Sequence, residues 1–65
     1  MLNTVALLVR VGWILERGQA AVTYIDEPEV VRVAQQLASA IREASTTPEQ
    51  ARFIGTQLLE NWGTG

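Results

Sequence analysis

The chain has 65 residues, of which 48% are hydrophobic and 18% are charged, and its formal net charge at pH 7 is −2. It contains no cysteine and no histidine, which excludes disulfide bonds and argues against a structural zinc site. All five basic residues are arginines, so the usual catalytic bases and nucleophiles reduce to carboxylates, hydroxyls and one tyrosine. We therefore expect neither catalytic residues nor a cofactor.

The first third of the chain is rich in β-branched residues, and its apolar side chains recur at every second position. The positions with this spacing are Val5, Leu7, Val9, Val11, Trp13 and Leu15. In an extended chain such a set points to one face of a sheet. With a tight turn at Arg17-Gly18, the pattern predicts a β-hairpin with strands at about residues 4–16 and 19–25.

A helix over residues 2–17 is the alternative for this segment. Gly18 would then supply the left-handed backbone conformation that ends many helices. Such a helix would be apolar on nearly all sides, so partner chains would have to bury it. Its valines, Thr4 and Gly12 are weak helix formers, and the valines and the threonine suit a pleated surface, which favours the strand.

A change of period from two to about 3.6 marks the next element. Asp26 can cap a helix whose first turn holds Pro28 and Glu29, since proline and acidic residues are favourable there. One apolar stripe follows, formed by Val30, Val33, Ala34, Leu37, Ala38, Ile41 and Ala44. The pattern predicts a helix at about residues 28–44.

A second helix start follows soon afterwards. Thr47 can cap it, Pro48 suits its first position, and Gln50 completes a capping box. Its apolar side is formed by Ala51, Ile54, Gly55, Leu58 and Trp62. The sequence predicts a helix at about residues 48–62 that runs antiparallel to the preceding one as a helical hairpin, with Gly55 allowing a close approach between the two.

Together these elements predict a single α+β domain over residues 1–65, a small two-layer ββαα unit in which the β-hairpin packs on the helical hairpin. The alternative is an all-α three-helix oligomer. A chain of this mass buries only about 60% of its surface on folding, and it has no disulfide or zinc site to compensate. We therefore expect a homodimer or a higher oligomer.

The expected self-association site lies at the start of the first strand. That strand is longer than its partner, so residues Val5, Leu7 and Val9 would lie on an unpaired edge. Such an edge recruits another strand. A twofold dimer in which the first strand pairs with its own copy would satisfy it.

Phe53 breaks the apolar pattern of the last predicted helix. It projects almost opposite Ile54 and Leu58, beside Gln57 and Glu60. An aromatic side chain left in water at such a place marks a candidate contact with another protein or with a second copy of the chain.

No group of residues in the sequence predicts a metal site. The only acidic cluster is formed by Asp26, Glu27 and Glu29. Carboxylates of this kind could hold a hard cation, but their position at a helix start already accounts for them.

The charge balance argues against nucleic acid as a partner, because five arginines stand against seven acidic residues and binding phosphates requires a basic surface. The order of a strand at residues 20–25 followed by two helices nonetheless resembles that of ribbon-helix-helix repressors, in which paired strands of a dimer enter the major groove. This resemblance of element order implies an alternative function as a dimeric DNA-binding repressor.

The apolar run from Val5 to Leu15 has about half of the roughly 20 residues that a membrane-spanning helix needs. We therefore expect a cytoplasmic protein without a membrane partner. The function that fits the sequence best is a small homo-oligomeric protein–protein interaction module, acting as a regulator, adaptor or inhibitor without catalytic activity.

Overall fold

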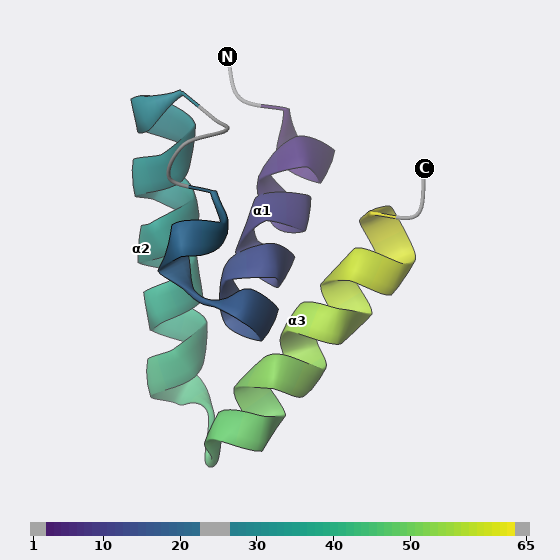
Figure 1. Cartoon of the computed structure of the whole chain (residues 1–65). Coiled ribbons are helices and arrows are strands. Elements are labelled where there is room, and N and C mark those ends of the chain that lie inside the picture. Colours follow the sequence, from purple (N-terminus) through teal and green to yellow (C-terminus); the bar gives the residue numbers. More distant parts are fainter. Residues whose placement is uncertain (1–2, 23–26, 64–65) are drawn as a thin grey trace.

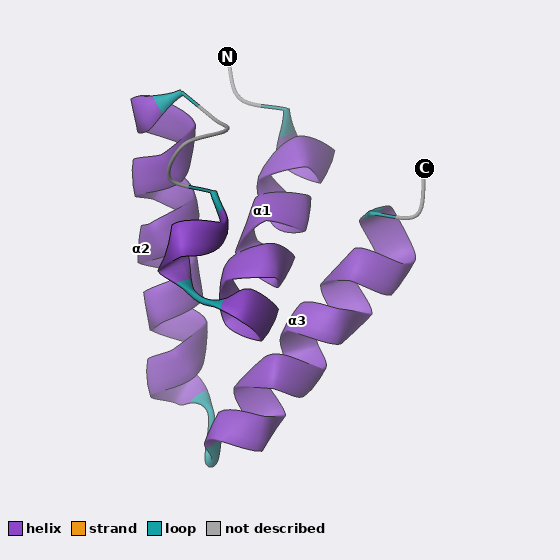
Figure 2. Ribbon diagram, in the orientation of Figure 1, coloured by secondary structure: helices purple, strands orange, loops and turns teal. Residues whose placement is uncertain are grey.

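The computed structural model describes residues 3–22 and 27–63. These residues form three α-helices and one short 3₁₀ helix, in the order α1 (Thr4–Arg17), η1 (Gln19–Ala21), α2 (Pro28–Ala44) and α3 (Pro48–Trp62) (Figures 1 and 2). No strand occurs in this part of the chain. The fold is all-α, so the predicted ββαα unit is wrong and its all-α alternative describes the arrangement of elements.

Residues 4–16 are helical rather than extended because both ends of α1 are capped. The Asn3 side-chain oxygen accepts hydrogen bonds from the backbone N–H groups of Val5 at 2.9 Å and Ala6 at 3.2 Å. Gly18 has a φ of 102°, and its N–H donates to the Ile14 carbonyl at 2.8 Å. These bonds satisfy backbone groups that a helix end would otherwise leave unpaired. Gly18 therefore ends a helix instead of turning a hairpin.

The many apolar residues of α1 are accommodated because this helix lies between the other two. Figure 1 shows α1 between α2 and α3, and it contacts both, whereas α2 and α3 contact each other only slightly. The buried residues of α1 are Val9, Val11, Gly12, Ile14 and Leu15. A helix that packs on two neighbours needs apolar side chains around much of its circumference. Apolar residues recur at every second position of α1 because the helix is buried on two sides, and the strand prediction from this spacing was wrong.

The second predicted strand does not form in its described part. Gln19–Ala21 make a single 3₁₀ turn, and Val22 is fully buried in the core. Residues 23–26, which include the rest of that strand and the predicted Asp26 cap, lie outside the described residues. The resemblance to ribbon-helix-helix repressors placed a strand at residues 20–25, and the described part of that range, residues 20–22, is not extended.

The two later helices, α2 and α3, occupy the predicted ranges. The N-cap of α2 is Glu27, which makes no side-chain capping hydrogen bond, and not the predicted Asp26. At the start of α3 the Thr47 side chain accepts a hydrogen bond from the Gln50 N–H at 3.1 Å. The Gln50 side chain reaches back to the N–H of Thr46 at 2.6 Å, one residue before the cap. Both bonds satisfy backbone donors at the helix start, as a capping box does.

The predicted close contact between the two later helices is also corrected. They diverge from their short link, and α1 fills the space between them (Figure 1). Gly55 accordingly approaches α1 rather than α2. An added Cβ at Gly55 would lie 2.8 Å from the Leu15 Cβ and 2.9 Å from the Gly12 carbonyl oxygen, distances that real Cβ atoms do not adopt. The backbones of α1 and α3 thus meet at Gly12 and Gly55, which we name the glycine crossing.

The fully buried core combines branched aliphatic side chains with alanines, and larger side chains such as Trp13 pack against it half-buried. Its buried hydrophobic members are Val9, Val11, Ile14, Leu15, Val22, Ala34, Ala38 and Ala51. The alanines come from α2 and α3, so both outer helices present small residues to α1. No described aromatic side chain belongs to this set, although aromatic residues bury the most area in ordinary cores.

Candidate functional site

Large apolar side chains remain on the surface of all three helices. The exposed fractions are 47% for Val5 on α1, 40% for Leu37 on α2, and 62% for Phe53 and 43% for Trp62 on α3. Single exposed residues of this kind are common. Their arrangement relative to the glycine crossing decides which of them form a continuous surface.

Two of them belong to one apolar surface. Val5 and Leu8 precede Gly12 by seven and four residues, and Leu59 and Trp62 follow Gly55 by four and seven. Residues at these spacings share a helix face, so on each helix the pair continues the side that carries the glycine. Because α1 and α3 run in opposite directions, both pairs lie toward the same end of the molecule.

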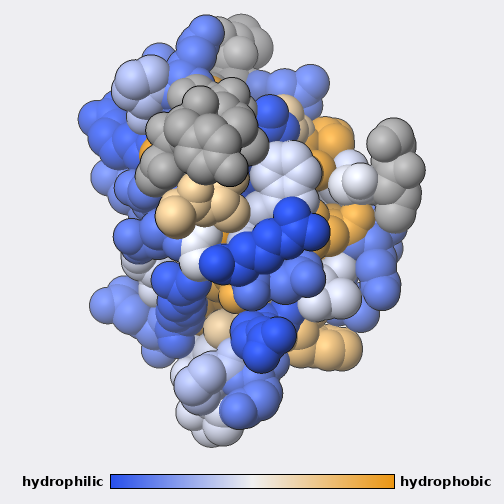
Figure 3. All heavy atoms as spheres, in the orientation of Figure 1, coloured by the Kyte–Doolittle hydropathy of each residue, from blue (hydrophilic) through white to orange (hydrophobic). Residues whose placement is uncertain are grey.

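This apolar surface, defined by Val5, Leu8, Leu59 and Trp62, is half-buried to exposed. Figure 3 shows hydrophobic atoms gathered between the N-terminal half of α1 and the C-terminal half of α3. Leu59 packs directly on Gly12, since a Cβ added at Gly12 would lie 3.0 Å from the Leu59 Cγ. This contact sets the position of α3 along α1. At the glycine crossing the backbones of α1 and α3 are in contact. Beyond it, the side chains of the apolar surface remain accessible to another chain.

The predicted self-association residues are only partly brought together. Val5 is exposed, Leu7 is half-buried against the core, and Val9 is 8% exposed. On a helix, residues two apart point in different directions, so Leu7 does not share a face with Val5. Association by strand pairing is ruled out for this segment, because its backbone groups are bonded within α1. The Leu7 N–H, for example, donates to the Asn3 carbonyl at 2.9 Å.

Phe53 lies where the sequence placed it, on the outer side of α3. Its position is about half a turn away from Gly55, so it points away from α1. Glu49, four residues earlier, and Glu60, seven later, are exposed along the same side. Phe53 is thus a single aromatic side chain with carboxylates before and after it, separate from the apolar surface.

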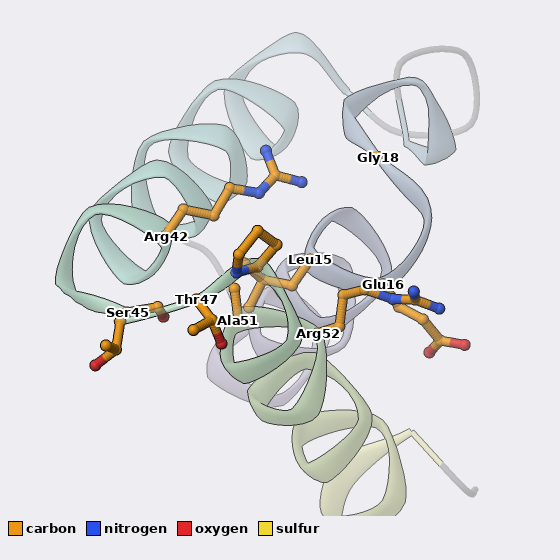
Figure 4. A pocket seen from close by; sticks show the side chains of 10 residues that line it. Leu15, Glu16, Gly18, Arg42, Ser45, Thr47, Ala51 and Arg52 are labelled. Carbon is orange, nitrogen blue, oxygen red and sulfur yellow. The ribbon is translucent and has the colours of Figure 1, made fainter.

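A pocket of about 410 Å³ lies where the end of α1 meets the link between α2 and α3. Its lining comprises Leu15, Glu16, Gly18, Arg42, Ser45, Thr46, Thr47, Pro48, Ala51 and Arg52. Figure 4 shows Arg42 extending from α2 and Arg52 from α3, with Leu15 between them in this view. Arg42 also joins two helices, because its Nη2 donates to the Ile14 carbonyl oxygen at 2.8 Å.

A second hollow of about 410 Å³ lies along α2, and all of its lining residues except Ala40 have polar or charged side chains. Its lining comprises Gln19, Arg32, Gln35, Gln36, Ser39, Ala40 and Glu43. It lacks the apolar floor that Leu15, Pro48 and Ala51 give the first pocket.

Sequence reasoning missed the two arginines of the first pocket. A signal was present, because Arg42 lies in the last turn of one predicted helix and Arg52 in the first turns of the next. A short link brings such positions close together in space. The contribution of α1 to the pocket was not predictable from a segment expected to be a strand.

Among residues 3–22 and 27–63, no group of three or more acidic side chains is placed to hold a metal ion. Glu27 and Glu29 are exposed near the start of α2, and Asp26 lies outside the described residues. Within the same residues, each helix is too short or too polar to cross a membrane.

Comparison with family models, curated proteins and solved structures gives no match for this chain. Its function has to be inferred from its own residues.

Proposed function

We propose that this protein is a small homo-oligomeric protein–protein interaction module that acts as a regulator, adaptor or inhibitor, without catalytic activity. In this proposal two surfaces have different roles. The apolar surface between α1 and α3 joins copies of the chain, and the outer side of α3 around Phe53 binds a different protein.

The observation that carries the proposal is that large apolar side chains are exposed on the surface although alanines occupy part of the buried core. Three of the eight buried hydrophobic residues are alanines, whereas Phe53 and Trp62 are 62% and 43% exposed. Burial of apolar surface contributes about 25 cal/mol per Å², so the exposed side chains of Phe53 and Trp62 leave stabilisation unused that their burial would contribute. A second copy that covers Trp62 and its neighbours would supply it.

The shape of the apolar surface suits contact with its own copy. Val5 and Leu8 come from one helix, and Leu59 and Trp62 come from another, so a twofold axis between the helices of two copies would set each pair against the other.

Phe53 supports a second contact because it lies on the opposite side of α3 from the glycine crossing. A self-association surface that uses Trp62 therefore leaves Phe53 free. Aromatic side chains are enriched among the residues that contribute most to binding energy. The flanking carboxylates of Glu49 and Glu60 favour a partner with an apolar pocket and basic residues at its rim.

Sedimentation velocity of matched variants tests self-association. We expect Trp62→Glu to shift the protein toward the monomer, because a carboxylate at the centre of the interface would be desolvated without a partner. Leu37→Glu on α2 is the control, since Leu37 has a similar exposed fraction, 40%, and lies outside the apolar surface. Equal sedimentation of wild type and Trp62→Glu, with both folded, would contradict the assignment of the surface.

The Phe53 contact is tested by cross-linking in cells followed by identification of the linked proteins. We expect a protein that is linked to the wild type and to Leu37→Glu to be lost from Phe53→Arg, while self-association of Phe53→Arg is retained. A set of linked proteins that does not depend on Phe53 would remove this part of the proposal.

A further inference from the structure

The pocket at the end of α1 combines charged and apolar groups in a way that neither proposed contact surface uses. Arginines from two different helices, Arg42 and Arg52, line it together with the apolar side chains of Leu15, Pro48 and Ala51. We propose that this pocket binds a single carboxylate that carries a short apolar group.

The guanidinium groups supply the recognition of the carboxylate. Arg42 uses Nη2 on the Ile14 carbonyl at 2.8 Å, which leaves the other donors of its planar fork. Arg52 makes no hydrogen bond or ion pair within the described residues. The guanidinium fork matches the two oxygens of a carboxylate. Arg52, whose donors are not used within the described residues, supplies this contact, and Arg42 adds a second positive charge.

The net charge of the lining selects for one negative charge. Two arginines and the carboxylate of Glu16 line the pocket, which leaves a formal charge of one positive unit. The positive end of the α3 dipole lies nearby and adds to the attraction. A second negative charge on the ligand would meet Glu16, so the pocket favours a monoanion over a dianion.

The apolar side chains select for a ligand with a hydrocarbon part. Leu15 is almost fully buried and Ala51 is 4% exposed, so both present fixed apolar surface at the floor. The volume of about 410 Å³ is at the small end of ordinary ligand sites. It has room for a hydrocarbon group beside the carboxylate, whereas an inorganic anion would leave the floor uncovered.

Two sources can present this chemistry: a free short-chain carboxylic acid, and the C-terminal carboxylate of a peptide whose last side chain is apolar. The probes distinguish them. Hexanoate represents the free acid, and N-acetyl-leucine represents the peptide end. Hexanamide and N-acetyl-leucinamide are the uncharged controls, acetate lacks the apolar part, and adipate carries a second charge.

The experiment is a titration of the isotope-labelled full chain followed by amide chemical shifts. We expect hexanoate, N-acetyl-leucine or both to shift the amides of Gly18, Thr46 and Ala51 with saturation, and the amide controls to leave them unchanged. Arg52→Gln should weaken binding roughly tenfold, as expected for the loss of a hydrogen bond to a charged group. Arg32→Gln, at an exposed arginine outside this pocket, should leave the affinity unchanged, and Glu16→Gln should allow adipate to bind.

Arg52 is the decisive position because Arg42 also holds the end of α1, so that loss of binding in an Arg42 variant could follow from local unfolding. Saturation by only one of the two acids assigns the source of the carboxylate. The proposal is overturned if neither acid shifts these amides, if the uncharged controls shift them equally, or if Arg52→Gln and Arg32→Gln bind alike.

Discussion

The glycine crossing and the apolar surface are two parts of the same helix pair, and they differ in the size of their side chains. At the crossing, Gly12 and Gly55 have no side chains, and the backbones of α1 and α3 come together. One and two turns from the crossing, Leu8 and Val5 on α1 and Leu59 and Trp62 on α3 are half-buried or exposed. Small residues thus fix where the helices meet, and large residues further along leave a surface open for another chain.

Gly55→Ala attacks the crossing most directly and should have the largest effect on folding. The new Cβ would lie 2.8 Å from the Leu15 Cβ and 2.9 Å from the Gly12 carbonyl oxygen, and backbone cannot move aside cheaply. We expect overpacking of about 3 kcal/mol, offset by about 1 kcal/mol of better helix propensity. Denaturant unfolding should show the net loss, and an increase in stability would show that the helices are not in contact here.

Gly12→Ala tests the same contact from the other helix with a smaller expected loss, about 1 kcal/mol. Its Cβ would lie 3.0 Å from the Gly55 carbonyl oxygen and 3.0 Å from the Leu59 Cγ. The leucine side chain can rotate away, so part of the clash is relieved. In one unfolding series, Gly55→Ala should lose more stability than Gly12→Ala. A larger loss for Gly12→Ala would contradict the geometry.

Arg42→Ala removes the hydrogen bond that joins α2 to the end of α1 beside the crossing. The bond to the Ile14 carbonyl measures 2.8 Å, but the arginine is exposed, so solvent screening reduces its contribution to about 1 kcal/mol. Hydrogen exchange should increase at Gly18, whose N–H shares the same carbonyl, more than at Gln50. Unchanged exchange at both would indicate that the bond does not hold the end of α1.

Phe53→Ser should have the smallest effect on folding, less than about 0.5 kcal/mol, because surface substitutions away from packed sites rarely cost more. Its 62% exposed side chain contacts little within the chain. Thermal unfolding and sedimentation should match the wild type. A loss of several degrees in the unfolding temperature would mean that Phe53 is part of this chain's own packing instead of a surface for a partner.

The sequence predicted the elements that have one buried face and missed the one that has two. Thr47, Pro48 and Gln50 specify the start of α3 through local bonds, and local bonds are readable from neighbouring residues. The apolar positions of α1 are set by α2 and α3 together, so no single period describes them. Gly12 was counted against a helix, although it marks the place where another helix comes closest.

The candidate sites also differ in whether they lie on one helix or combine several. The exposure of Phe53 followed from its angle to the apolar side of one helix, which a sequence can supply. The apolar surface and the pocket each combine side chains of separate helices, such as Leu8 with Leu59 and Leu15 with Arg52. Their composition depends on which helices become neighbours, and that depended on the correct structure of residues 4–17.

If copies of this chain cover each other's apolar surface, the thermal unfolding of the protein depends on its concentration. An oligomer that is more stable than its separated chains unfolds at a lower temperature when it is diluted. We expect the unfolding midpoint of the wild type to fall steadily with dilution and that of Trp62→Glu to be low at all concentrations. A sharp wild-type transition whose midpoint does not change with concentration, in a protein that sediments as a monomer, would contradict the proposed self-association.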